Sequence, residues 1–299
     1  MYNHIAMTDR DPPHENSHNQ RGRPAGRWSW LFRCVRIALV VYLGLVLLLM
    51  FFEESLIFFP SRFPNGNWQP VGIEFEEVEF ESGDGTRLHA WHFPHPQPRA
   101  HILFCHGNAG HLADRAWLMQ QLRDELDVEV FIFDYRGYGK SDGKPNGKGI
   151  LLDGRAACET FAGRAGIDTS DILPMGRSLG GAVAVDLAVE YGTRGLVLES
   201  TFTSTFDMAT HYYPFLPVRL LMRTRLDSVA KIRQFQGRLL QSHGDDDEML
   251  RYEMGKQLFS AANDPKTFIT IGGGRHNDPQ TAEYYTALDE FIDEVSRNS

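Results

Sequence analysis

The sequence predicts one α/β domain in which helices cover both faces of a mostly parallel sheet, preceded by an N-terminal transmembrane helix. Along residues 101–295, short apolar segments typical of buried strands alternate with helical segments, as in sheets whose parallel strands are joined by crossover helices. A charge-free apolar run lies ahead of that pattern. The chain has 299 residues, 42% of them hydrophobic, which is enough to build one sizeable core.

The first 27 residues are polar and rich in Pro, Asn, His, Gln and Arg, which predicts a disordered arm over residues 1–27. Residues 37–52 then form the apolar run, 16 residues without a charge. As a helix they would measure ~24 Å, against ~30 Å for the hydrocarbon core of a bilayer. Apolar residues on both sides, in 28–32 and 56–59, extend the contact. Residues 28–59 are therefore predicted to be a transmembrane anchor with its flanks.

The alternative to an anchor is a cleaved signal peptide, which needs a small-x-small site after its apolar run. Phe52-Glu53-Glu54-Ser55 follows the run instead, so we expect no cleavage. A buried core helix is disfavoured because Arg residues flank one end and no amphipathic stripe is visible. The excess of Arg before the run predicts a single-pass membrane protein whose N-terminus is cytoplasmic. The α/β domain is then expected on the opposite side, in a periplasmic or other extracytoplasmic space.

The net charge of −9 is unevenly distributed. Residues 1–36 hold six Arg and three acidic residues, hence +3, which leaves −12 on residues 53–299. Such an acidic domain is a poor partner for nucleic acid, which selects basic surfaces. The three cysteines, Cys34, Cys105 and Cys158, form neither a disulfide framework nor a zinc spacing. The last two are predicted to be small buried hydrophobic residues, and we expect no metal and no cofactor.

The α/β domain is predicted to occupy residues 60–299. Its first two strands, Glu74–Phe80 and Arg87–Phe93, flank a Ser82-Gly83-Asp84-Gly85 turn and should form an antiparallel hairpin at one edge of the sheet. The remaining strands are expected at His101–Cys105, Val128–Phe133, Asp171–Met175, Gly195–Leu198, Leu239–Ser242 and Phe268–Ile271. Helices are expected at Leu112–Leu126, Gly149–Ala165, Ala182–Tyr191 and Thr281–Val295.

A long segment separates two of these strands. Residues 202–235 are rich in aromatic residues and Pro, and they are too many for a simple connection. We interpret them as a small cap insert over the site, with Tyr212, Phe215 and Leu221 as candidates for the substrate pocket. The alternative is an ordinary helix pair packed on the sheet.

The pentapeptide Gly176-Arg177-Ser178-Leu179-Gly180 fits the pattern G-x-S-x-G. An apolar strand precedes it and a helix of small residues follows, which is the context of a nucleophile on a sharp strand-to-helix turn. Glycines two before and two after the serine relieve steric clash, so the hydroxyl can project above the sheet. A Gly-rich structural turn is the bland alternative. A serine hydroxyl is a poor nucleophile at neutral pH, so a base must take its proton.

Of the twelve histidines, His276 is the best placed to act as that base. It follows the last predicted strand and the flexible turn Gly272-Gly273-Gly274, so a loop can carry its imidazole over the nucleophile. His89, His92 and His95 lie on or after an early strand, without a carboxylate at ligand spacing. They are predicted to belong to a surface strand and loop rather than to a metal site.

An acid must hold the imidazole in the right tautomer and balance its charge. Asp245-Asp246-Asp247-Glu248 follows the strand predicted at Leu239–Ser242, and chemistry alone does not choose among the three aspartates. A Ca²⁺ loop is the rival interpretation, but the segment lacks alternating ligands and a closing bidentate Glu. The segment is therefore expected to supply the acid.

A tetrahedral oxyanion needs two backbone N–H donors. At a strand–turn–helix nucleophile, one donor is the residue after the serine, here Leu179, and the other comes from the loop after an earlier strand. That loop is His106-Gly107-Asn108-Ala109-Gly110, in which we choose Asn108. The His106 side chain is expected to be structural.

Six segments carry a family resemblance: Glu54–Pro60, His106–Gly110, Phe133–Ser141 with its Asp134-Tyr135-Arg136-Gly137-Tyr138-Gly139, Gly176–Gly181, His243-Gly244-x-x-Asp247 and His276-Asn277-Asp278. Together they resemble the α/β-hydrolase superfamily, and within it the membrane-anchored subgroup that bears the D-Y-R-G-Y-G segment. That subgroup includes lysophospholipases, protein depalmitoylases and bacterial members. The resemblance spans roughly residues 55–298.

The resemblance implies an α/β-hydrolase fold and a choice of acid. In the family the acid lies three residues after His-Gly, which is Asp247 here, and the order Ser178, Asp247, His276 is the one this fold uses. Two positions depart from the family pattern. Leu250 stands where Val is usual and Arg251 where Pro is frequent, so this loop is expected to sit slightly differently.

The sequence thus predicts a membrane-anchored serine hydrolase that cleaves carboxylic ester or thioester bonds of small acyl-ester or lipid-like substrates. Ser178 would form an acyl-enzyme, with His276 as general base and Asp247 orienting it, and the N–H groups of Leu179 and Asn108 would bind the oxyanion. A peptidase or acyltransferase using the same triad is one alternative. A non-enzymatic membrane protein with a relict hydrolase fold is the other.

Overall fold

The computed structural model describes residues 26–297, so all but the end of the predicted disordered arm, residues 1–27, lies outside the described residues. The chain divides into two units, Met1–Leu48 and Leu49–Ser299. The first unit contains most of helix α1 (Gly26–Phe51), and the second contains the α/β domain.

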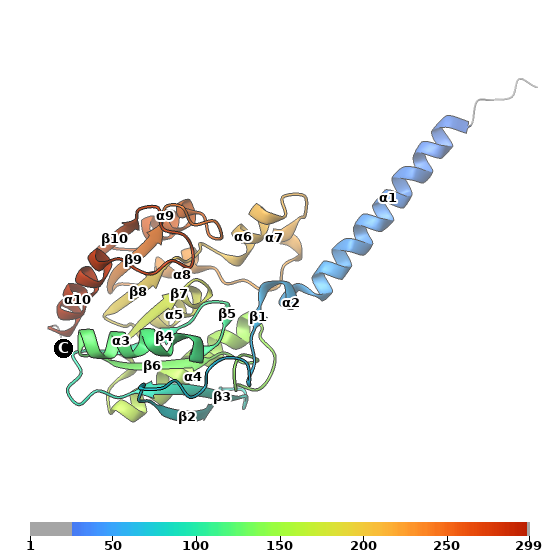
Figure 1. Cartoon of the computed structure of the whole chain (residues 1–299). Helices are drawn as coiled ribbons and strands as arrows, with labels where there is room; N and C mark the ends of the chain where they lie inside the picture. The colour runs from blue at the N-terminus through green and yellow to red at the C-terminus, as the bar shows by residue number, and fades with distance from the viewer. Residues whose placement is uncertain (1–25, 298–299) are drawn as a thin grey trace, which may run out of the picture. The chain divides into compact units, whose positions relative to one another are not determined.

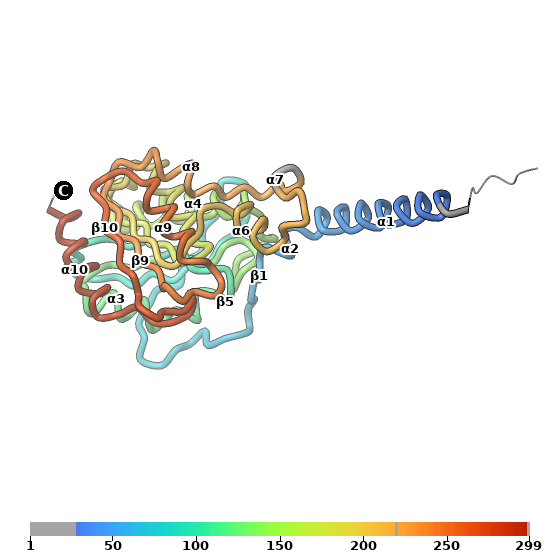
Figure 2. Tube along the Cα trace, turned by 90° about the horizontal axis from the view of Figure 1, so that it is seen from above, coloured from blue at the N-terminus to red at the C-terminus, as the bar shows by residue number. Residues whose placement is uncertain are grey.

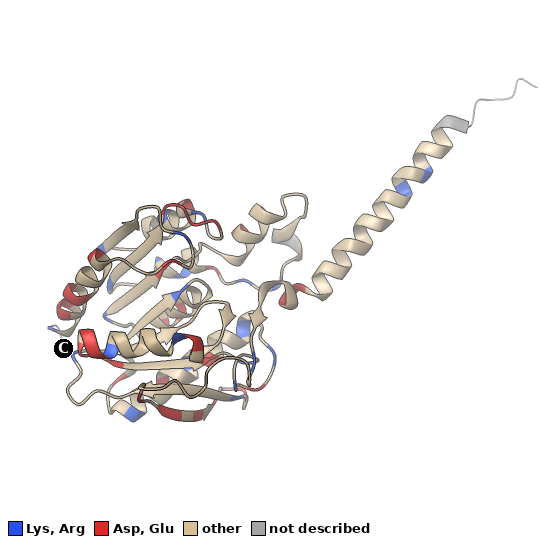
Figure 3. Ribbon diagram, in the orientation of Figure 1, with Lys and Arg blue, Asp and Glu red and all other residues tan. Residues whose placement is uncertain are grey.

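Helix α1 is longer than the charge-free run that predicts it. Its segment Trp28–Phe51 has 24 residues, and an 18-residue window within it has a mean hydropathy of 2.6, so the helix is long and apolar enough to cross a membrane by length and composition. A helix of this length measures ~36 Å, so the residues before the run supply the turn that the run alone lacks. A signal sequence near the N-terminus would have the same properties. Basic residues lie in its N-terminal half, and Glu53 and Glu54 follow its end (Figure 3).

An eight-stranded sheet forms the centre of the second unit, in the order β10-β9-β8-β7-β4-β6-β3-β2 (Figure 1). The strands are β2 (Glu76–Glu81), β3 (Arg87–Phe93), β4 (His101–Cys105), β6 (Glu129–Asp134), β7 (Ile172–Arg177), β8 (Gly195–Glu199), β9 (Arg238–Gly244) and β10 (Lys266–Ile271). Strand β3 pairs antiparallel with both β2 and β6, and the other neighbours are parallel. The predicted α/β architecture and the antiparallel hairpin at one edge are both confirmed. A separate short pair joins β1 (Phe59–Pro60) to β5 (Ala109–Gly110).

Helices cover both faces of the sheet. The helices of the second unit are α2 (Glu53–Ile57), α3 (Ala116–Leu126), α4 (Gly147–Ala165), α5 (Leu179–Tyr191), α6 (Thr205–Tyr212), α7 (Val218–Leu221), α8 (Ser228–Ile232), α9 (Tyr252–Ala261) and α10 (Ala282–Ser296), with 3₁₀ turns at Leu112–Arg115 and Thr169–Asp171. Leu103 and Phe131 share one core cluster with α4, α5, α8 and α9. Ile102 and Ile132 share another with α3 and α10. Figure 2 shows α3 and α10 along one side of the domain and α4 and α8 along the other. Because both faces are covered, the central strands are apolar at most positions, and their charged residues lie mainly at the strand ends, as Glu129 and Asp134 do in β6.

Helix α9 is not predicted from the sequence. Its core contacts come from Met254 and Leu258, which lie one turn apart. Gly255 stands between them because a Cβ at that position would lie 2.4 Å from the His243 ring. A glycine inside a segment lowers the helix propensity of that segment. The glycine that the contact with His243 requires therefore weakens the sequence signal for a helix here.

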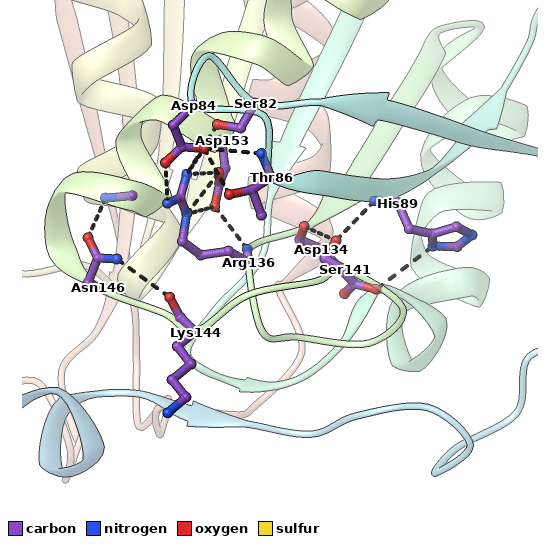
Figure 4. A network of polar contacts seen from close by, with 11 residues as sticks. Ser82, Asp84, Thr86, His89, Asp134, Arg136, Ser141, Lys144, Asn146 and Asp153 are labelled. Atoms are coloured by element: carbon purple, nitrogen blue, oxygen red, sulfur yellow. Dashed lines mark hydrogen bonds and ion pairs between the residues drawn. The ribbon is translucent and has the colours of Figure 1, made fainter.

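The D-Y-R-G-Y-G segment holds the sheet edge together (Figure 4). The Arg136 guanidinium lies 2.7 Å from Asp153 on α4 and 2.7 Å from Asp84 in the β2–β3 turn. Asp134 accepts the Leu112 N–H at 2.8 Å, and its carbonyl accepts the Ser141 hydroxyl at 2.7 Å. Asp153 is fully buried, and a buried charge of this kind needs such partners. The segment therefore ties together the hairpin, α4 and the loop after β6.

The prediction that His89 and His92 lie on a surface strand is wrong. Both are buried, because other segments cover the two faces of β3: His92 packs against Phe161 of α4, and His89 packs against Trp68. His92 Nε2 lies 2.6 Å from one oxygen of Glu129, and His101 Nδ1 lies 2.8 Å from the other. Burial raises the pKa of Glu129, but the bonds from His101 and His92 outweigh it and lower that pKa to about 2. Within the described part of the chain, no group of three or more His, Cys, Asp or Glu is arranged to hold a metal ion.

The predicted cap insert, residues 202–235, is not uniform. Both of its ends belong to the core, where Phe202 and Phe235 are each 2% exposed and Ile232 is fully buried. The middle, residues 206–225, contains α7 and all of α6 but its first residue, and where burial is described there most residues are exposed or half-buried. The part of the insert that lies outside the core is thus shorter than the predicted insert. Its role as a cap stays a prediction.

Candidate active site

Ser178 lies on a strained turn between β7 and α5. Its backbone has φ 54° and ψ −117°, a conformation that a non-glycine residue adopts only where its surroundings impose it. A Cβ at Gly180 would lie 1.9 Å from the Cys105 carbonyl oxygen, and one at Gly176 would lie 2.4 Å from the Gly180 oxygen. The two glycines of the pentapeptide are therefore required by the close approach of neighbouring backbone.

Three hydrogen bonds hold this turn. The Ser178 N–H donates to the Glu199 carbonyl at 2.9 Å. The Ser178 carbonyl accepts the Gly181 N–H at 3.0 Å and the Thr201 hydroxyl at 2.7 Å. Such bonds offset the cost of the strained backbone and fix the position from which the hydroxyl projects.

The structure brings Ser178, His276 and Asp247 together. His276, in the loop after β10, has Nε2 3.2 Å from Ser178 Oγ and Nδ1 2.8 Å from Asp247 Oδ2. Arg177 holds this loop, because its guanidinium donates to the carbonyls of His276 at 2.9 Å and Asp278 at 3.3 Å. The three side chains come from loops after β7, β9 and β10, where the carboxyl ends of parallel strands meet at one edge of the sheet.

Among the three adjacent aspartates, Asp247 is the one that contacts His276. Its side chain is buried; Oδ1 accepts the N–H groups of Met249 at 2.9 Å and Leu250 at 2.8 Å, and Oδ2 also lies 3.3 Å from His243 Nε2. Burial raises the pKa of Asp247, but the bonds from His243, His276 and Leu250 outweigh it and hold that pKa well below its usual range. The carboxylate is therefore ionised at neutral pH.

The other two aspartates are exposed. Asp245 Oδ1 accepts the Gly273 N–H at 2.6 Å, which links the acid loop to the loop that carries His276. Neither Asp245 nor Asp246 has a side-chain contact with the imidazole among the described residues. The three aspartates have the same side chain, and burial in the fold is what distinguishes Asp247 from the other two.

The two predicted oxyanion donors flank the nucleophile. Leu179 is the first residue of α5, and the first N–H groups of a helix have no intrahelical acceptor. Asn108 follows Gly107, where a Cβ would lie 3.4 Å from Ser178 Cβ, so its loop lies against the nucleophile. Within residues 26–297, neither the Leu179 nor the Asn108 N–H donates to a backbone carbonyl. Both groups are thus available to a ligand.

The predicted pocket residues lie on or beside the exposed part of the insert. Tyr212 and Phe215 are 50% and 63% exposed, and Leu221 is half-buried. The Tyr212 hydroxyl donates to the Met249 carbonyl at 2.7 Å, which connects α6 to the acid loop. A cavity of about 700 Å³ between α6, α8 and α9 is lined by other residues, such as Lys256. The assignment of these three residues to a substrate pocket stays a prediction.

Four residues near the site are given no role by the sequence patterns: Arg177, Glu199, His243 and Tyr284. The Tyr284 hydroxyl donates to Glu199 at 2.6 Å, and burial raises the pKa of that carboxyl, opposed by Arg177. His243 Nε2 lies 2.8 Å from the Leu250 carbonyl oxygen. Arg177 and His243 belong to the segments already singled out, so their positions carry a signal. Glu199 is the last residue of a buried strand, and the only sequence signal for it is a charged residue at the end of an apolar segment.

Comparisons with known proteins place the chain in a family. A family model described as serine aminopeptidase, S33, matches residues 96–229. The chain is 36% identical over 257 residues to Rv2307c of Mycobacterium tuberculosis, covering 85% of this chain and 91% of that protein. It is 34% identical to the α/β hydrolase domain-containing protein WAV2 of Arabidopsis thaliana, covering 78% and 84% of the two chains.

Solved structures agree on the fold. An esterase of Pyrococcus furiosus, Pf2001, superposes with a TM-score of 0.63 at 18% identity, covering 80% of this chain and 96% of that one. The α/β hydrolase domain in the description of WAV2 and the strained strand-to-helix turn at Ser178 agree with this fold. The chain belongs to the α/β-hydrolase superfamily.

Proposed function

We propose that this hydrolase cleaves carboxylic ester or thioester bonds of acyl substrates through an acyl-enzyme on Ser178. One observation carries the proposal: Ser178 Oγ, the His276 imidazole and the Asp247 carboxylate form a continuous series at 3.2 Å and 2.8 Å. These separations suit proton transfer from the hydroxyl to the imidazole. The strained serine and the two available N–H groups beside it support the same chemistry.

The reaction follows from these positions. His276 Nε2 takes the hydroxyl proton as Ser178 Oγ attacks the acyl carbon, and Asp247 stabilises the imidazolium that forms. The N–H groups of Leu179 and Asn108 bind the tetrahedral oxyanion. The alcohol or thiol then leaves with the proton from His276. In the second half, His276 deprotonates water, which attacks the acyl carbon, and then returns the proton to Ser178 Oγ as the bond between Oγ and the acyl carbon breaks and the acid is released.

Labelling with a fluorophosphonate tests this proposal. The probe reacts only with an activated serine, so the wild-type protein should be labelled and Ser178→Ala should not. Loss of a triad member typically costs ~10⁴-fold or more in kcat, so ester hydrolysis should vanish with the label. Ser260→Ala, which removes an exposed hydroxyl on α9, is the matched control. Labelling that persists in folded Ser178→Ala would contradict the proposal.

Peptide hydrolysis is the second candidate, favoured by the description of the matched family model. An aminopeptidase must bind the free α-ammonium group of its substrate, which calls for a carboxylate near the site. Exposed acidic residues, Asp245, Asp246 and Glu248, flank Asp247. Turnover of aminoacyl p-nitroanilides at rates above those of p-nitrophenyl esters would favour this candidate over the first.

We further propose that the span Trp28–Phe51 anchors the protein in a membrane, with the N-terminus cytoplasmic and the catalytic domain on the opposite side. Of the flank predicted at residues 53–59, Phe58 is buried in the core of the second unit and does not extend the span. The length and mean hydropathy of Trp28–Phe51 support a span, and Arg33 and Arg36 support its orientation. Protease added on the cytoplasmic side of sealed vesicles should leave residues 53–299 intact. Digestion of the domain there would reverse the orientation, and a mature chain starting near residue 55 would indicate a cleaved signal.

A further inference from the structure

The segment Glu53–Pro60, here called the strap, follows the apolar run and has no part in the mechanism above. It contains α2 and β1. Phe58, in its middle, is only 2% exposed and belongs to the core. The strap therefore packs into the catalytic unit as part of it.

The strap binds the loop that carries Asn108. Asn108 Nδ2 donates to the Ile57 carbonyl at 2.6 Å, and Asn108 Oδ1 accepts the Phe59 N–H at 3.1 Å. The same oxygen accepts the Tyr138 hydroxyl at 2.7 Å. Next to these bonds, Phe59 and Pro60 pair with Ala109 and Gly110. The Asn108 carboxamide thus uses both its NH₂ group and its oxygen to hold the loop. The group of Asn108 that can bind the oxyanion is its backbone N–H.

The strap also binds the insert. Glu53 is 7% exposed, and its carboxylate accepts the N–H groups of Arg223 at 3.0 Å and Thr224 at 2.6 Å. The Arg223 guanidinium donates in turn to the Met50 carbonyl at 2.7 Å. A buried carboxylate is costly unless it is hydrogen-bonded in this way. Its neighbour Glu54 is exposed, so the two adjacent acids differ in burial while sharing charge and size.

We propose that the strap is a positioning element of the active site. Through the Asn108 side chain it holds the Asn108 N–H where the oxyanion forms, and through Glu53 it fixes the end of the insert. The inference rests on the proposed hydrolysis at Ser178. Its physical basis is that an oxyanion donor acts only at hydrogen-bonding distance from the developing charge, and small misplacements of reacting groups are costly. Asn108 is therefore expected to act twice, with its N–H on the oxyanion and its carboxamide on the strap.

The test compares full-length variants on a soluble ester, p-nitrophenyl butyrate, with active sites counted by fluorophosphonate titration. Asn108→Ala removes all three side-chain bonds and leaves the backbone N–H in place. Removal of a whole oxyanion donor costs ~10²–10³-fold in kcat, so its misplacement should cost about 10–100-fold per titrated site. KM should change by less than about threefold, because the donor acts on the transition state.

The matched pair Glu53→Gln and Glu54→Gln tests the other end of the strap. Both remove one negative charge, but only the first weakens the bonds to the Arg223 and Thr224 N–H groups. We expect kcat per titrated site to fall about 3–10-fold in Glu53→Gln and to stay within about twofold of wild type in Glu54→Gln. The pH dependence of kcat/KM should be unchanged in both, since His276 and Asp247 are untouched.

A merely structural strap would give a different pattern. Asn108→Ala and Glu53→Gln would then lower Tm and the titratable fraction, while kcat per titrated site stayed at the wild-type value. That result would overturn the inference and leave the proposed hydrolysis standing. If Asn108→Ala does not fold, the same comparison of Glu53→Gln with Glu54→Gln decides. Absence of labelling in the wild-type protein would instead refute the hydrolysis, and the inference with it.

Discussion

Replacing Asp247 with Asn should inactivate the enzyme while keeping the size and shape of the side chain, since one carboxylate oxygen becomes an NH₂ group. The reason lies in the orientation of the new amide. Oδ1 of Asp247 accepts two backbone N–H groups, from Met249 and Leu250. The amide oxygen of Asn must take that place, because an NH₂ group there would face two donors. The NH₂ group then points at His276 Nδ1, where the carboxylate oxygen lies at 2.8 Å in the wild type.

The consequence for His276 is a change of tautomer. An NH₂ donor facing Nδ1 favours the imidazole with its proton on Nε2, and such a ring cannot accept the proton of Ser178 across the 3.2 Å between Nε2 and Oγ. A wrong tautomer in a serine triad costs ~10⁴-fold in kcat, or ~5 kcal/mol at 1.36 kcal/mol per decade. We expect a loss of this order for Asp247→Asn.

The assay is kcat/KM on a p-nitrophenyl ester together with the rate of fluorophosphonate labelling. Asp245→Asn is the matched control, because Asp245 is exposed and accepts one N–H, from Gly273. Its amide can rotate to keep that bond, so the loss should stay within about threefold. Equal and small losses in both variants would refute the assignment of Asp247 as the orienting acid.

Three further outcomes are expected. Arg136→Met leaves a buried carboxylate without its charged partner and should cost ~3–5 kcal/mol in the free energy of unfolding by urea, whereas Arg87→Met, on an exposed ion pair, should leave that free energy nearly unchanged. The pKa of Glu129, lowered from 4.5 to about 2, means that its contribution to stability is complete above pH 4.5 and fades as the pH falls toward 2. Glu129→Gln should therefore lower Tm at pH 7 and lower it less at pH 3; an equal loss at both would refute the linkage. If the insert covers the site, kcat/KM on p-nitrophenyl esters should rise from acetate to octanoate at up to ~0.8 kcal/mol per buried CH₂, and Phe215→Ala with Leu221→Ala should flatten the rise. A profile that peaks at acetate would count against a lipid-like substrate.

Much of the sheet is legible in the sequence because its strands are buried on both faces. The segment His101–Cys105 is predicted with its actual bounds, and β7 begins one residue later than predicted, at Ile172, and ends two residues later, at Arg177. A strand covered on both sides is apolar at most positions, and that pattern can be read locally in the sequence. The nucleophile turn is legible for a similar reason, since the close backbone contacts at Gly176 and Gly180 exclude every residue with a side chain.

The features that sequence patterns miss depend on contacts between distant segments. His92 looks like a surface residue because its partner, Glu129, lies 37 positions away on a neighbouring strand. The insert looks uniform because nothing local marks Ile232 as core and Phe215 as exposed. In the acid loop, the three aspartates are chemically equal, and only the fold buries Asp247. Tertiary packing decides each of these cases.

The strap shows the same limit at the site itself. Asn108 is selected in the sequence for its backbone N–H, as part of a loop after a strand, and nothing in that argument requires an asparagine. The structure supplies the requirement, because its carboxamide must donate to Ile57 and accept from Phe59, 49 residues away. The chain therefore enters the catalytic unit at the edge of the sheet that carries Ser178. Only eight residues, Glu53–Pro60, separate the end of the apolar run from the end of β1, which pairs with the loop that carries Asn108. A change in the segment next to the proposed anchor would accordingly reach the oxyanion loop through two hydrogen bonds, with no need to alter the triad.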